Sequence, residues 1–200
     1  MRSHLTVYRV RVEKILSDGA AANGDPQACL DVAQELRLHG NNLIGQGFSF
    51  RALHKYQRAL DIIAKFAPQP RPFHPTQGLP PNFPPAGPET RPADARLHSL
   101  HCILLSNVAV CFLQLRKWNA AVKVCNELLE KQASPVDPQI RLKALVRRCK
   151  ACAELGDWET ALNDARAVKA ESAEAWAGLG EVVRRCGELK EAHASRQRSV

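Results

Sequence analysis

Residues 139–169, QIRLKALVRRCKACAELGDWETALNDARAVK, hold the clearest structural pattern in the chain. Apolar residues recur in the first half at i, i+3, i+7 and i+10, which is the spacing of a buried helical stripe. They are Leu142, Leu145, Cys149 and Cys152. A second helical pattern begins at Trp158, directly after Gly156 and Asp157, which are suited to end one helix and to cap the next. The stretch therefore predicts an amphipathic helix hairpin.

Two cations of the first predicted helix form a candidate anion-binding pair. Lys143 and Arg147 are four residues apart, so they project from one helical face, one turn apart. The residues that the rest of the chain brings to this face determine whether the pair binds an anion.

The composition favours an all-α fold in one ordinary domain. Hydrophobic residues make up 45% of the chain but aromatic residues only 6%, and alanine and leucine are abundant. No apolar run is expected to reach the roughly 20 residues of a membrane span, and no secretory signal follows the N-terminal arginines. These features predict a cytoplasmic protein without a membrane partner.

The cysteines are expected to be reduced core residues. There are seven, an odd number, and most fall within predicted apolar stripes, which favours a reducing compartment. Cys149 and Cys152 have the spacing of half a zinc site or of a redox pair, but no second Cys or His pair is suitably spaced. We therefore predict structural packing, with no metal and no cofactor.

The net charge of +8 suggests an acidic partner. A modest basic cluster within residues 141–150 could contact phosphates, but aromatic residues suited to base stacking and known nucleic-acid motifs are missing. An acidic protein partner explains the charge equally well. We predict no nucleic-acid partner.

No catalytic constellation is recognisable. The seven histidines lack nucleophile or acid partners at familiar spacings, and no glycine-rich phosphate loop is present. The chain is therefore expected to be no enzyme and to have no small-molecule substrate.

Two segments fall outside the helical pattern. Residues 3–17 alternate like a strand but also fit an amphipathic helix, which we favour in a helical chain. Residues 68–92 hold ten of the thirteen prolines, a density that excludes a helix and predicts an exposed, disordered loop. A tolerated insertion is the favoured interpretation, although such segments can dock on aromatic-lined grooves.

Small alanines mark an internal repeat. Ala52, Ala121, Ala161 and Ala192 each follow an aromatic or apolar residue by two to four positions. Their spacing fits a base period of about 34 residues with two insertions and one small deletion, which indicates a solenoid of two-helix units. Alanine would recur there because the two helices of a hairpin approach closely. In the last unit the second helix should begin near Leu189.

These units resemble the tetratricopeptide repeat family. Residues 173–192, AEAWAGLGEVVRRCGELKEA, are close to its A-x-A-W-x-x-L-G…G-x-x-x-x-A pattern, and residues 149–162 and 39–60 are similar to it. Residues 105–129, LSNVAVCFLQLRKWNAAVKVCNELL, look like the middle repeat of immunophilin-type co-chaperones, without the isomerase domain. Arg116 replaces a turn glycine of the family.

The resemblance implies a right-handed superhelical solenoid of antiparallel helix pairs, with three full repeats and a short fourth. The last helix is short and polar and is expected to act as a cap. The expected organisation is an N-terminal extension (1–24), repeat one (25–66), the proline-rich loop (67–94), repeat two (95–131), repeat three (138–170) and a partial fourth repeat or C-terminal cap (172–198).

The resemblance also implies a binding site. Co-chaperones of this family hold the Glu-Glu-Val-Asp tail of heat-shock chaperones in a two-carboxylate clamp of Lys, Asn, Asn, Lys and Arg. The matching positions in this chain are Arg37, Asn41, Asn107, Lys143 and Arg147. Only Arg37 differs, and it keeps the charge but not the compact ammonium group. Arg148 also fits the family, as a side chain whose stem packs on the hairpin.

The leading hypothesis is a peptide-binding co-chaperone or adaptor whose partner is the acidic C-terminal tail of a heat-shock chaperone of the 90- or 70-kDa class. The alternative is a general tetratricopeptide scaffold for a non-chaperone complex. It would bind its partner through the same groove or through the proline-rich loop.

Overall fold

A computed structural model describes residues 26–66, 92–130 and 136–198, and in these residues all regular secondary structure is helical. The all-α prediction is confirmed for this part of the chain. The segments predicted for residues 1–24 and for most of 67–94 lie outside it. The helices are α2 (Pro26–Gly45), α3 (Ser49–Phe66), α4 (Pro92–Gln114), α5 (Trp118–Glu130), α6 (Pro138–Leu155), α7 (Trp158–Glu171), α8 (Ala173–Ala177) and α9 (Gly180–Arg198).

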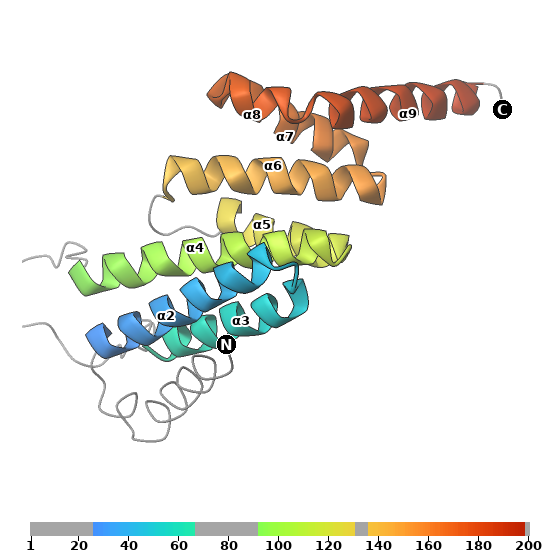
Figure 1. Cartoon of the computed structure of the whole chain (residues 1–200). Helices are drawn as coiled ribbons and strands as arrows, with labels where there is room; N and C mark the ends of the chain where they lie inside the picture. Colours follow the sequence, from blue (N-terminus) through green and yellow to red (C-terminus); the bar gives the residue numbers. More distant parts are fainter. Residues whose placement is uncertain (1–25, 67–91, 131–135, 199–200) are drawn as a thin grey trace, which may run out of the picture.

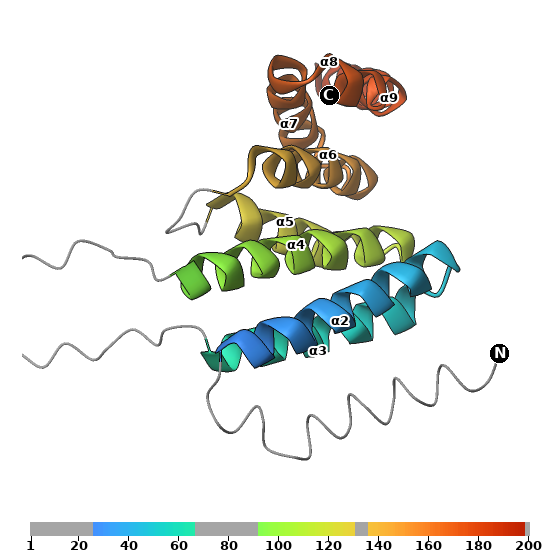
Figure 2. The ribbon, with the colours of Figure 1, turned by 60° about the vertical axis from the view of Figure 1, so that its left-hand side comes forward.

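Neighbouring helices pack in pairs, and the pairs follow one another in a single stack (Figures 1 and 2). α3 contacts both α2 and α4, and α5 contacts both α4 and α6, so each second helix joins two pairs. α4 also contacts α2 and α6 directly. The first helices α2, α4 and α6 therefore lie side by side, and this arrangement positions the candidate site.

Three hairpin turns share one backbone hydrogen-bond pattern. In each turn the amide after the turn residue donates to the carbonyl five positions earlier, as in the Schellman helix terminus. The bonds are Phe48 to Leu43 at 2.9 Å, Lys117 to Phe112 at 2.8 Å and Asp157 to Cys152 at 2.9 Å. The hairpin predicted from residues 139–169 is confirmed, and its Asp157 side chain accepts from the Thr160 amide at 3.1 Å.

The turn residues themselves lie in the left-handed region. Gly47 has φ of 82° and Gly156 has φ of 79°, while Arg116 has φ of 55° at the equivalent place. The prediction that Arg116 occupies a glycine position is therefore confirmed. A side chain in this region brings its Cβ close to the following carbonyl oxygen, so the α4–α5 turn is strained where the other two are relaxed.

Three of the four repeated alanines are buried where paired helices meet. Ala52 and Ala121 are fully buried and Ala161 is nearly so, each five positions after its turn residue. Their burial is what the expected close approach of two paired helices requires. Ala192, in contrast, is exposed.

The predicted hairpin in the last unit is wrong. α8 has only five residues, and α9 runs without interruption from Gly180 past Gly187 and Leu189. Gly187 has no positive φ, and no residue after it caps a new helix. Arg184 forms ion pairs with Glu181 and Glu188 on either side, which support a continuous helix through this glycine.

α4 is more apolar than expected. Its Ala95–Gln114 window of 20 residues has a mean hydropathy of 1.5, long and apolar enough to cross a membrane, so the expectation that no such run exists is wrong. Half of the window is buried within the protein, because α4 contacts α2, α3, α5 and α6. The core position of this helix is sufficient to explain its composition.

All seven cysteines are free and buried, as predicted. In the described part of the chain, no three Cys, His, Asp or Glu side chains are placed to hold a metal ion. Burial raises the pKa of Cys125 and of Cys149 from 9.0 to about 12. These thiols are therefore protonated packing residues rather than nucleophiles.

Arg116→Gly is expected to raise the free energy of unfolding by about 1 kcal/mol, because glycine removes the strain at positive φ. Gly156→Arg should lower the free energy of unfolding by a similar amount, because it introduces a side chain at positive φ. The new Cβ meets only ordinary contacts, so no clash adds to this loss. Urea unfolding followed by circular dichroism measures both. A destabilised Arg116→Gly protein would contradict the strain argument.

The free energy of unfolding should fall as pH rises above 9. Unfolded thiols ionise there, whereas Cys125 and Cys149 keep their protons up to a pKa of about 12, so alkaline conditions favour the unfolded chain. Urea midpoints at about pH 8 and about pH 10 measure the effect. Cys149→Ala should reduce this pH dependence. An unchanged pH dependence in this variant would show that Cys149 does not contribute to it.

Candidate functional site

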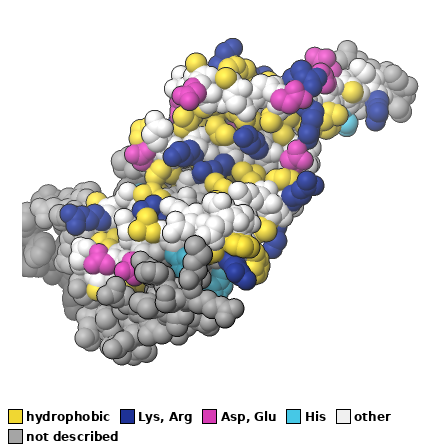
Figure 3. All heavy atoms as spheres, in the orientation of Figure 1, with side chains coloured by type: hydrophobic (Ala, Val, Ile, Leu, Met, Phe, Trp, Pro, Cys, Tyr) yellow, Lys and Arg dark blue, Asp and Glu magenta, His cyan; other side chains and the backbone are white. Residues whose placement is uncertain are grey.

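The five residues of the predicted clamp lie on the three adjacent first helices. Arg37 and Asn41 are on α2, Asn107 is on α4, and Lys143 and Arg147 are on α6. Lys and Arg side chains gather in the middle of the face on which α4 and α6 lie (Figure 3). The stacking of the hairpins thus brings residues far apart in the sequence onto neighbouring elements.

Hydrogen bonds between helices hold three of these residues. Asn41 and Asn107 bond to each other, and Arg147 bonds to α4, the helix that carries Asn107. Asn107 Nδ2 donates to Asn41 Oδ1 at 3.1 Å, which joins α4 to α2. Arg147 Nη1 donates to the carbonyl oxygen of Ser106 at 2.9 Å and also to its hydroxyl, which joins α6 to α4 beside Asn107. Arg37 and Lys143 flank this row on the two outer helices and bond to none of the other three.

Tyr56 on α3 orients Asn41 and was not predicted as a site residue. Its hydroxyl donates to Asn41 Oδ1 at 2.8 Å, and its ring packs so closely on α2 that a Cβ at Gly40 would lie 2.4 Å from Cε1. Burial raises the pKa of Tyr56 to about 12, although the charge of Arg37 acts in the opposite direction. The phenol therefore stays protonated and donates.

The sequence signal for Tyr56 was only that of a core residue. It lies on the inner side of its helix, and 1% of it is exposed. Nothing in the spacing distinguishes an aromatic ring that only packs from one whose hydroxyl fixes an amide. Ser106 was missed for a similar reason, because its hydroxyl is buried within an apolar helix.

The amides are held so that they present donors. Asn41 Oδ1 accepts from both Tyr56 and Asn107, so its Nδ2 group remains to donate, and no acceptor for it lies among the described residues. Asn107 Nδ2 uses one of its two hydrogens on Asn41. The remaining N–H hydrogens of Asn41 and Asn107 suit an anionic or carbonyl oxygen.

The three cations of the site have no carboxylate partner in the described part of the chain. Its ion pairs involve other residues. Arg37 Nε is buried without a hydrogen-bond partner there. Burial lowers the pKa of Arg147, whose hydrogen bonds go only to the neutral oxygens of Ser106. An arginine nevertheless stays charged, so this surface carries positive charge that an anion would neutralise.

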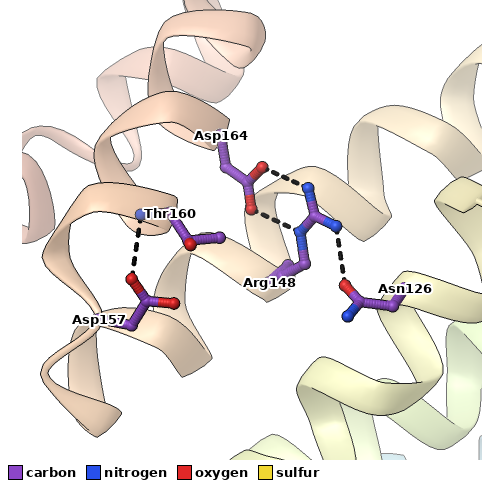
Figure 4. A network of polar contacts seen from close by, with 5 residues as sticks. All are labelled: Asn126, Arg148, Asp157, Thr160 and Asp164. Carbon is purple, nitrogen blue, oxygen red and sulfur yellow. Dashed lines mark hydrogen bonds and ion pairs between the residues drawn. The ribbon is translucent and has the colours of Figure 1, made fainter.

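Arg148, next to Arg147, points into the protein interior (Figure 4). Its Nε and Nη2 donate to the two carboxylate oxygens of Asp164 at 2.8 and 2.7 Å, and its Nη1 donates to Asn126 Oδ1 at 2.7 Å. These bonds join α6 to α7 and α5. Arg148 was predicted only to pack its stem on the hairpin. It also forms a buried ion pair, in which the Arg148 side chain is 16% exposed and that of Asp164 5%.

Comparison with known proteins finds a weak similarity. No family model matches the chain. Over 138 residues it is 28% identical to the Arabidopsis thaliana protein named Peptidyl-prolyl cis-trans isomerase PASTICCINO1. The match covers 69% of this chain but only 18% of that relative, so the chain spans less than a fifth of its length.

The adjacent arginines Arg147 and Arg148 can be compared directly, because the first lies on the candidate site and the second in a buried ion pair. Arg148→Ala should lower the free energy of unfolding by about 3–5 kcal/mol, because it leaves the buried Asp164 carboxylate unpaired. Arg147→Ala leaves no buried charge and should cost only about 1–2 kcal/mol. Urea unfolding measures both values. Equal losses would show that Arg147 is also a structural residue.

Proposed function

We propose that this chain is a non-enzymatic peptide-binding module of the tetratricopeptide type, a co-chaperone or adaptor that captures acidic C-terminal tails. The observation that carries the proposal is the row of N–H donors and unpaired cations across α2, α4 and α6. Asn41, Asn107 and Arg147 are held in that row by hydrogen bonds between helices.

The fold proposed with this function is a right-handed superhelical solenoid. Three hairpins with the same turn geometry, each followed by a buried alanine, support a repeat of one unit. Helix contacts between consecutive pairs are those expected of a stacked array. In such an array the first helices share one face, which is the face that carries the five residues.

The chemistry of the face suits paired carboxylates. An arginine can bind a carboxylate through two parallel hydrogen bonds, and a lysine supplies a mobile ammonium group. Amide donors such as Asn41 Nδ2 can bind a terminal carboxylate or a peptide carbonyl and so fix the register of the tail. Hydrogen bonds to charged groups contribute about 1.5–3 kcal/mol each.

The proposed partner is the acidic tail of a heat-shock chaperone of the 90- or 70-kDa class, in the cytoplasm. All five positions match the co-chaperone clamp in charge or identity, with arginine at position 37 in place of lysine. The similarity to a protein named as a peptidyl-prolyl isomerase agrees with the likeness to immunophilin-type co-chaperones. The similarity points to a chaperone-associated role but does not itself identify the ligand.

A labelled Glu-Glu-Val-Asp peptide is expected to bind, and the variant Lys143→Ala with Arg147→Ala should weaken binding about 100-fold or more. Fluorescence anisotropy measures the dissociation constant. Amidation of the peptide terminus should also weaken binding, because one carboxylate is lost. Affinity should fall as salt rises, since exposed charges are screened.

The matched control is Lys123→Ala with Arg166→Ala, which removes the same charges from exposed positions on α5 and α7. This control should bind as the wild type does. The proposed function would be contradicted if amidation left the dissociation constant unchanged, or if the Lys143 and Arg147 double variant bound as tightly as the wild type.

A further inference from the structure

The five cations within α6 form two groups that differ in their partners. Arg141 is paired with Glu171 and Arg148 with Asp164, both on α7. Lys143, Arg147 and Lys150 have no carboxylate at ion-pair distance in the parts of the chain that the structure describes. Carboxylates of α7 thus neutralise Arg141 and Arg148, whereas the other three cations have no carboxylate partner there.

The unpaired group forms a stripe along one face of α6. At 100° per residue, positions 143, 147 and 150 fall within about 60° of the helix circumference, whereas 141 and 148 lie nearly opposite. Arg147 reaches Ser106 of α4, so the stripe faces the α4 side. Lys143 and Lys150 are both exposed, about 10 Å apart along the helix axis.

One acidic residue of α6 could have neutralised Lys150, but another helix holds it. Glu154 lies four positions after Lys150 and therefore on the same face. Its carboxylate instead accepts from Arg185 Nη2 of α9 at 2.8 Å. The contact between α9 and α6 thus keeps the third cation available to a ligand.

We propose that Lys150 is a specificity-determining residue that binds a second acidic side chain of the tail. This inference rests on the proposed function. An extended peptide advances about 3.3 Å per residue, so the distance between Lys143 and Lys150 corresponds to three residues. In the proposed clamp the terminal residue lies at Lys143, so the preferred ligand carries a carboxylate three positions before that residue, which in Glu-Glu-Val-Asp is the first glutamate.

The test is a double-mutant cycle between protein and peptide. Lys150→Gln, which removes the charge but keeps most of the stem, should weaken Glu-Glu-Val-Asp binding about twofold to fivefold. It should leave the binding of Gln-Glu-Val-Asp unchanged. Lys123→Gln, at an exposed lysine of α5, is the matched control and should not change the affinity for either peptide.

A second variant tests the same position indirectly. Arg185→Gln releases Glu154, which can then neutralise Lys150, so it should also weaken Glu-Glu-Val-Asp binding and spare Gln-Glu-Val-Asp.

The outcomes separate the two proposals. If Lys150→Gln affects both peptides equally or affects neither, the role of Lys150 is overturned while tail capture stands. If the wild-type protein ignores amidation of the peptide terminus, tail capture fails and the role of Lys150 fails with it.

Discussion

The buried ion pair between Arg148 and Asp164 fixes the orientation of the helix that the proposed site depends on. Its two parallel hydrogen bonds hold α6 to α7, and the third bond of the guanidinium, to Asn126, holds the same helix to α5. An isolated buried charge would be costly, so both partners have to be in place for these helices to pack. With this side of α6 anchored, the opposite side, which carries Lys143 and Lys150, is directed away from α7.

The proposed binding surface differs from the interior. In the interior, Arg148, Asp164 and Asn126 bond to one another, whereas on the α2, α4 and α6 face amide hydrogens and cationic side chains are left without a partner of opposite charge among the described residues. Asn41 shows how this is achieved: Tyr56 and Asn107 both occupy its oxygen, and the amide nitrogen remains. For the proposed ligand, this amide is therefore oriented before binding, which would lower the ordering cost of binding.

Much of this fold could be predicted because helix periodicity and turn chemistry are local signals. The hairpin of residues 139–169 was found from spacing alone, and the unusual Arg116 from comparison with the pattern of the family that the chain resembles. The last unit failed because Gly187 matches the repeat pattern, yet ion pairs around it stabilise a continuous helix. Lys143 and Arg147 stood out by their spacing on one helix, and the family resemblance joined them to Arg37, Asn41 and Asn107. The partners that orient them, Tyr56 and Ser106, depend on contacts between helices, and no pattern within one helix reveals these.

The seven buried thiols have a consequence for the lifetime of the protein. A protonated thiol inside a packed core reacts slowly with oxidants, and the oxidised, more polar sulfur that forms when the core opens does not pack again in the same space. Each opening in an oxidising environment is therefore a risk of permanent damage. The durability of the chain under oxidative stress is set by how often its hairpins separate, because local opening controls access to every one of its cysteines.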